Sequence, residues 1–140
     1  MAGEKVLVIE DKPEMIQILT DYVLGPQGYV VLTALNGEEG LRMALSEEPD
    51  LVILDLRLPK MSGLQVLQNL GEQQCQVPVI VITAYGSEEV LGRALQLGVD
   101  DYVVKPFELD EMINAIEGVL SKIKAEKASG DQQVADGSSC

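Results

Sequence analysis

The sequence contains no histidine among its 140 residues. Histidine is the one side chain whose ordinary pKa lies near neutrality, and it is a common metal ligand. Its absence excludes histidine-based acid–base catalysis, histidine–metal sites and a phosphohistidine on this chain. Cysteine is scarce: Cys75 lies in a polar stretch and Cys140 is the last residue. Two cysteines so placed give little reason to expect a structural disulfide, and less reason to expect a metal site.

Basic residues and long apolar runs are also in short supply. Ten lysines and arginines face 23 aspartates and glutamates, which gives a formal net charge of −13. This charge argues against direct binding of nucleic acid and favours cations or basic protein surfaces as partners. No apolar run approaches the roughly 18 residues of a membrane span, and no signal peptide is evident. We therefore expect a soluble cytoplasmic protein that does not bind a membrane.

Apolar segments of two kinds alternate along the chain, whose hydrophobic content is 46%. Buried strands are predicted at residues 5–9, 29–34, 51–55, 78–82 and 101–104. Helical spacing of apolar residues follows at 13–23, 37–45, 63–70, 88–95 and 109–123. This alternation predicts an α/β domain with right-handed crossovers and a parallel sheet covered by helices on both faces. The domain is expected at 4–124, with 125–140 as a disordered tail or truncated linker.

Polar side chains stand at the carboxyl ends of four predicted strands: Glu10 and Asp11, Asp55, Thr83 and Lys105. Open parallel sheets bind ligands beyond these strand ends, so adjacent strands would bring the five residues into one site. Crowded carboxylates repel one another and lose hydration, and a hard cation such as Mg²⁺ relieves both effects. With a hydroxyl and an ammonium nearby, the site would clamp a phosphoryl group, with Asp55 as the nucleophile.

Each of these residues also has an ordinary structural interpretation. The acid pair could only cap a helix, Asp55 could be a turn residue, Thr83 a strand residue, Tyr102 half-buried packing, and Lys105 a solvated lysine before Pro106. Each of these alternatives is a common one for a residue considered alone. The coincidence of all these residues at successive strand ends of one short chain favours the functional interpretation.

The same residues resemble the motifs of a known family. Glu10-Asp11, Asp55 with Pro59 and Gly63, Thr83-Ala84, Tyr102 and Lys105-Pro106 are similar to the receiver domain of bacterial two-component response regulators. The resemblance covers roughly residues 4–124. It implies a flavodoxin-like, doubly wound, five-stranded parallel sheet of order 2-1-3-4-5 with five helices. It also implies a phosphoacceptor signalling domain that catalyses only its own phosphotransfer and dephosphorylation.

The resemblance assigns roles to the acidic residues. Asp55 would accept a phosphoryl group from a histidine kinase or a histidine-containing phosphotransfer protein. Asp11, Asp55 and the backbone carbonyl of Arg57 would bind Mg²⁺ directly, and Glu10 would bind it mainly through water. The cognate kinase, the downstream output and the oligomeric state are not implied.

Three further residues would read out the phosphoryl group. Lys105 would pair with it, Thr83 would hydrogen-bond it and shift inward, and Tyr102 would rotate to follow. An aspartyl phosphate carries about two negative charges and three acceptor oxygens, so Thr83 and Lys105 gain contacts only in that state. The surface formed by helix 88–95, strand 101–104 and helix 109–123 would then switch. Gly92 weakens the first of these helices by roughly 1 kcal/mol relative to alanine.

The chain departs from the family pattern in three respects. Glu10 stands where many members have aspartate, which should shift the metal geometry slightly. Arg57 and Tyr85 lie two residues beyond Asp55 and Thr83, where their bulk should restrict water and slow the loss of the phosphoryl group. The last helix carries acids, among them Glu108 and Glu111, where bases usually support a dimer through this surface. We therefore do not expect that dimer.

Three rival functions remain. A Mg²⁺-dependent phosphatase of the dehalogenase-like type also uses an aspartate at a strand end, but it usually needs an acid where this chain has Arg57. A flavodoxin-type flavin carrier needs a hydroxyl- and glycine-rich phosphate loop, whereas Glu10-Asp11 would repel phosphate. A third possibility is a pseudo-receiver that acts as a constitutive binding module, which the complete set of site residues disfavours.

Overall fold

The computed structural model describes residues 3–84 and 87–129, with side chains through Ala125. Strands and helices alternate along the chain. In order they are β1 (Lys5–Ile9), α1 (Pro13–Ile18), a π-helical segment η1 (Leu19–Leu24), a 3₁₀ turn η2 (Gly25–Gln27), β2 (Val30–Ala34), α2 (Gly37–Ser46), β3 (Leu51–Asp55), α3 (Gly63–Glu72), β4 (Val79–Ala84), α4 (Glu88–Gln96), β5 (Asp101–Lys105) and α5 (Leu109–Ser129).

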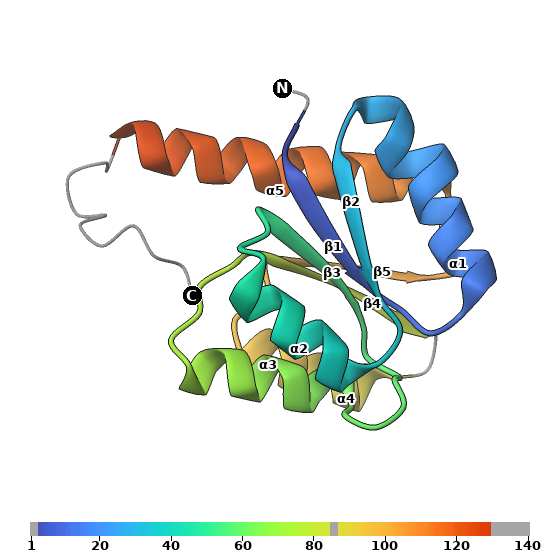
Figure 1. The fold of residues 1–140 in the computed structure, drawn as a ribbon, viewed down its shortest axis with the longest axis vertical. Helices are drawn as coiled ribbons and strands as arrows, with labels where there is room; N and C mark the ends of the chain where they lie inside the picture. The colour runs from blue at the N-terminus through green and yellow to red at the C-terminus, as the bar shows by residue number, and fades with distance from the viewer. Residues whose placement is uncertain (1–2, 85–86, 130–140) are drawn as a thin grey trace.

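The strands form one parallel sheet of five in the order β2-β1-β3-β4-β5. Helices α1 and α5 cover one face, and α2, α3 and α4 cover the other (Figure 1). This arrangement is the predicted flavodoxin-like α/β fold. All five strands run the same way, so their carboxyl ends meet along a single edge of the sheet.

The central strands are buried on both faces, because helices cover both. Leu7 and Ile9 of β1 pack in the core under α2 and α3, whereas Val6 and Val8 pack in the core under η1 and α5. The same alternation divides β3, every residue of which is buried. This double burial explains why β1, β3 and β4 are almost continuously apolar in the sequence.

Three local features differ from, or extend, the sequence-based expectations. The first helix is not uniform, since α1 gives way to the π-helical segment η1. Ser87 precedes α4, but its side chain donates and accepts no capping hydrogen bond. Helix α5 continues to Ser129, past the expected boundary at 124, and residues 130–140 of the predicted tail lie outside the described residues. Among the described residues, no helix is long and apolar enough to cross a bilayer.

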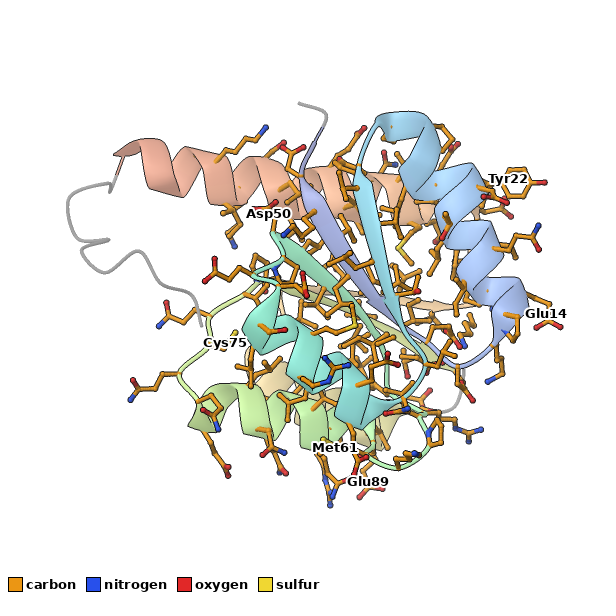
Figure 2. The ribbon with its side chains drawn as sticks, viewed as in Figure 1. Glu14, Tyr22, Asp50, Met61, Cys75 and Glu89 are labelled. Carbon is orange, nitrogen blue, oxygen red and sulfur yellow. The ribbon has the colours of Figure 1, made fainter. Side chains whose placement is uncertain are left out.

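Cys75 follows α3, where Figure 2 labels it, and its side chain is buried. It is disulfide-bonded, so the expectation of no disulfide is wrong at this residue. The polar sequence around Cys75 suggested an exposed loop, whereas the residue packs against the core beneath α2 and α3. Cys140 lies outside the described residues.

Candidate functional site

The strand register brings the polar residues at the strand ends together. Ile9 of β1 lies opposite Leu54 of β3, so Glu10 and Asp55, the next residues along each strand, are neighbours. Asp55 lies opposite Ile82 of β4, and Ala84 lies opposite Lys105 of β5. Three adjacent parallel strands and the edge strand β5 therefore deliver their terminal residues to one place.

Three carboxylates form the centre of this site. One oxygen from each of Glu10, Asp11 and Asp55 lies within 4.8 Å of the other two. Glu10 is fully buried and Asp55 is 3% exposed, whereas the Asp11 side chain is 35% exposed. Buried glutamate and aspartate need a compensating partner, because both desolvation and mutual repulsion disfavour their charged forms.

Backbone amides hold one oxygen of each buried carboxylate. The Lys12 N–H donates to Glu10 Oε2 at 3.1 Å, and the Arg57 N–H donates to Asp55 Oδ1 at 2.9 Å. In both cases the donor is two residues after the acid, so the local backbone turn orients the side chain. The remaining oxygens of Glu10 and Asp11 (Oε1 and Oδ1) are buried and accept no hydrogen bond among the described residues.

Lys105 supplies positive charge to the cluster. Its Nζ donates a hydrogen bond to Asp55 Oδ2 at 3.2 Å and lies 3.9 Å from Glu10 Oε1. The side chain is 23% exposed, so the ammonium reaches the carboxylates from the solvent side. The Lys12 Nζ lies 3.8 Å from Asp11 Oδ1, so two ammoniums face three carboxylates and the site keeps an excess of negative charge.

The pKa of Glu10 is raised from its ordinary value of 4.5 to about 7. The main cause is burial, which disfavours the carboxylate, and the second is the negative charge of Asp55. Lys105 and the Lys12 N–H oppose the shift without cancelling it. In the absence of a cation, Glu10 is therefore a weak acid that carries a proton over much of the acidic pH range.

A cavity of about 430 Å³ opens beside Asp55. Arg57, Thr83 and Lys105 line it, together with residues from the starts of three helices: Lys12, Ser62, Leu64, Ser87 and Val90. The Thr83 hydroxyl is buried and has no hydrogen-bond partner among the described residues. The cavity thus places an unsatisfied hydroxyl and an ammonium around the accessible face of Asp55.

The sequence-predicted residues do not all reach this site. Glu10, Asp11, Asp55 and Lys105 lie together, Thr83 and Arg57 line the same cavity, and Tyr102 lies elsewhere. The Tyr102 side chain is 42% exposed and lines a separate groove between β5 and α5. Tyr85, to which restricted water access was attributed, is outside the described residues.

Lys12 is a site residue that the sequence analysis did not identify. Its backbone holds Glu10, its Nζ lies 3.8 Å from Asp11 Oδ1, and it lines the cavity. Its position directly after the acid pair was the available signal.

The three carboxylates suit a hard divalent cation. The buried oxygens of Glu10 and Asp11 that lack a hydrogen bond are the acceptors that such an ion would satisfy, and oxygen is the ligand that Mg²⁺ prefers. The site contains neither the histidine nor the thiolate ligands typical of softer metals.

Comparison with known proteins settles the family. The model of the response regulator receiver domain matches residues 6–117. The chain belongs to the response regulator receiver domain family. Its members are signalling domains of two-component systems rather than classical enzymes.

Individual relatives of this receiver domain differ in length. The chain is 43% identical over 114 residues to the probable C4-dicarboxylate response regulator DctR of Bacillus subtilis, covering 81% of this chain and 50% of that protein. It is 34% identical to sporulation initiation phosphotransferase F of the same organism, covering 86% of this chain and 96% of that protein. The chain thus spans about half the length of several curated relatives it matches and nearly all of another.

A solved structure confirms the fold. The signal receiver domain of a putative Luxo repressor protein from Vibrio parahaemolyticus superposes with a TM-score of 0.84 at 28% identity. The match covers 91% of this chain and 97% of that one.

Proposed function

We propose that this receiver domain accepts a phosphoryl group on Asp55 from a histidine kinase or a histidine-containing phosphotransfer protein. One observation carries the proposal: a buried aspartate at the end of β3 is held by a backbone amide and an ammonium, beside two acids with unsatisfied oxygens. Such a carboxylate is fixed in orientation and faces a cavity large enough for a phosphoryl group.

In the proposed reaction an Asp55 oxygen attacks the phosphorus of a phosphohistidine on the donor. A P–O bond forms while the P–N bond breaks, and the bonding electron pair leaves with the imidazole nitrogen. The product is an aspartyl phosphate. Lys105 would hold the phosphoryl oxygens, and Arg57 N–H would keep Asp55 aligned for the attack.

We assign Mg²⁺ to Asp11, Asp55 and the Arg57 carbonyl, with Glu10 acting mainly through water. When bound, the ion would neutralise charge on the transferring phosphoryl group. The buried oxygens of Glu10 and Asp11 that lack hydrogen bonds support this assignment.

The switch is proposed to begin at Thr83. Its buried hydroxyl has no partner among the described residues, so a phosphoryl oxygen would offer its first hydrogen bond. Movement of Thr83 toward the phosphoryl group would vacate space toward β5, and the exposed Tyr102 could rotate inward. The surface of α4, β5 and α5 would then control an output in the cytoplasm. Relatives named as a transcriptional regulatory protein and as a phosphotransferase illustrate two kinds of output.

The experiment is the intact mass after incubation with acetyl phosphate, with and without Mg²⁺. We expect one Mg²⁺-dependent phosphoryl addition to the wild-type protein and none to Asp55→Asn. Asp110→Asn is the matched control, since it removes an exposed carboxylate on α5 outside the site. Phosphorylation that survives Asp55→Asn would refute the assignment of the acceptor. An unmodified wild-type protein that binds Mg²⁺ would favour the pseudo-receiver instead.

A further inference from the structure

Gly37, the first residue of α2, touches the loop that follows the phosphoacceptor. Its N–H donates to the Pro59 carbonyl at 3.4 Å. A Cβ built on Gly37 would lie 1.9 Å from the Met61 carbonyl oxygen and 2.7 Å from its carbon. Figure 2 shows Met61 beside the amino-terminal end of α2. The helix and the loop therefore meet backbone against backbone, which only glycine permits at this position.

The conformation of Gly37 does not itself require glycine, because its φ does not lie in the left-handed region. The requirement comes from the close approach alone. An added methyl group would force the helix and loop apart by about 1.5 Å before ordinary contact distances were reached.

Helix α2 has little freedom to withdraw from the loop. Asn36 Oδ1 accepts the Glu39 N–H at 2.9 Å, and Glu39 Oε1 accepts the Leu35 N–H at 3.1 Å, so the start of the helix is capped in both directions. One turn later, a Cβ on Gly40 would lie 2.6 Å from the fully buried Ile9, so α2 already packs tightly on β1. The loop is therefore the part that would move.

Movement of this loop would reach the phosphoacceptor. The loop between β3 and α3 carries Arg57, whose N–H orients Asp55 and whose carbonyl we assigned to Mg²⁺. Its far end is also tightly packed, since a Cβ on Gly63 would lie 2.8 Å from the Asp55 carbonyl oxygen. Gly37 contacts the loop at Pro59 and Met61, which lie between Arg57 and Gly63.

We propose that Gly37 is a positioning residue for phosphoryl transfer: its lack of a side chain sets the loop that aligns Asp55 and presents the Arg57 carbonyl. The proposal rests on the function proposed above. It predicts that Gly37→Ala weakens Mg²⁺ binding and slows phosphorylation by more than the loss of stability explains.

The test compares Gly37→Ala with two control variants. Gly25→Ala would also meet a backbone oxygen, that of Thr20 at 2.6 Å, but it lies in η2, in the connection from η1 to β2. Gly71→Ala fills open space on α3 and should not disturb the site. The double variant Gly37→Ala with Gly71→Ala tests the same change in a protein whose helix α3 has a higher intrinsic helix propensity.

Three measurements are made on each variant. Calorimetric titration gives the Mg²⁺ dissociation constant, hydrogen exchange without metal gives the protection of the Met61 and Gly63 amides, and mass spectrometry gives the rate of phosphorylation by acetyl phosphate. Those two amides are chosen because they donate to Pro59 and Leu56 within the loop.

For both Gly37→Ala variants we expect a roughly ten-fold weaker Mg²⁺ affinity, faster exchange of the two amides and a rate lowered about 10- to 100-fold, because a misplacement of only about 1 Å can have an effect of that size. Gly25→Ala should lower only the stability. Wild-type Mg²⁺ affinity and amide protection in folded Gly37→Ala would overturn the proposal. If the wild-type protein gained no phosphoryl group, the proposed function would fail, while amide exchange would still decide the role of Gly37.

Discussion

Replacement of Glu10 by glutamine should make the metal-free protein more stable at alkaline pH. Glu10 is fully buried, and its pKa is raised from 4.5 to about 7 by burial and by the charge of Asp55. The folded state therefore holds the proton more tightly than the unfolded chain does. This contribution to stability is fully present below pH 4.5 and is lost as the pH rises through about 7.

The size of the effect follows from the shift. Each unit of pKa difference corresponds to about 1.4 kcal/mol, so the wild-type protein should lose about 3 kcal/mol of unfolding free energy relative to Glu10→Gln between pH 4.5 and pH 8. Glutamine keeps the shape of the side chain and an oxygen for the Lys12 N–H, but it never ionises. Most other pH effects cancel in the difference between the two proteins.

The assay is urea unfolding in the presence of EDTA, from pH 5 to 8.5, followed by far-UV circular dichroism, because the chain has no tryptophan. Glu72→Gln is the control: it removes an exposed carboxylate at the end of α3 and should follow the wild-type pH dependence. In Asp55→Asn the pH dependence should move to lower pH, since the second cause of the shift is removed. A constant difference between wild type and Glu10→Gln across this range would refute the reasoning.

Three further changes test other parts of the site and fold. Lys105→Met should destabilise the metal-free protein at pH 8 by about 1–3 kcal/mol, because Asp55 and Glu10 lose their ammonium; urea unfolding without and with Mg²⁺ measures it, and equal stability would contradict the electrostatic account. Thr83→Ala should change the unphosphorylated stability by less than about 1 kcal/mol, since its hydroxyl has no partner among the described residues; a larger loss in the same assay would reveal a missed hydrogen bond. Gly92→Ala should stabilise α4 by up to about 1 kcal/mol because a Cβ there meets open space, and thermal unfolding should show a higher midpoint rather than a lower one.

The sheet and the group at its carboxyl edge could be predicted because they depend on one-dimensional patterns. A strand buried on both faces is continuously apolar, and its first polar residue marks the edge of the sheet, as Asp55 does after Leu54. The clustering of Glu10, Asp55 and Lys105 then follows from parallel topology. The clustering of these residues does not depend on the details of side-chain packing.

Features that depend on side-chain geometry could not be predicted in the same way. The switch from α1 to the wider turns of η1 leaves the apolar spacing of the sequence largely unchanged. Ser87 directly precedes α4 but does not cap it, and the backbone at this residue (φ −104°, ψ 38°) departs from the extended conformation usual for a capping residue. The burial of Cys75 depends on how α3 ends against the core rather than on its polar neighbours.

The orientation of the acids could not be predicted from the sequence, although their identity could. Glu10 and Asp55 are each held by the N–H two residues later, so the backbone of the following loop decides which oxygen remains available. For Asp55 that loop is the one against which Gly37 packs. A glycine far from Asp55 in the sequence therefore bears on the direction of its carboxylate, and a motif confined to the residues around Asp55 cannot include it. The geometry of this site is set by contacts between loops and helix ends as much as by the residues that carry its charge.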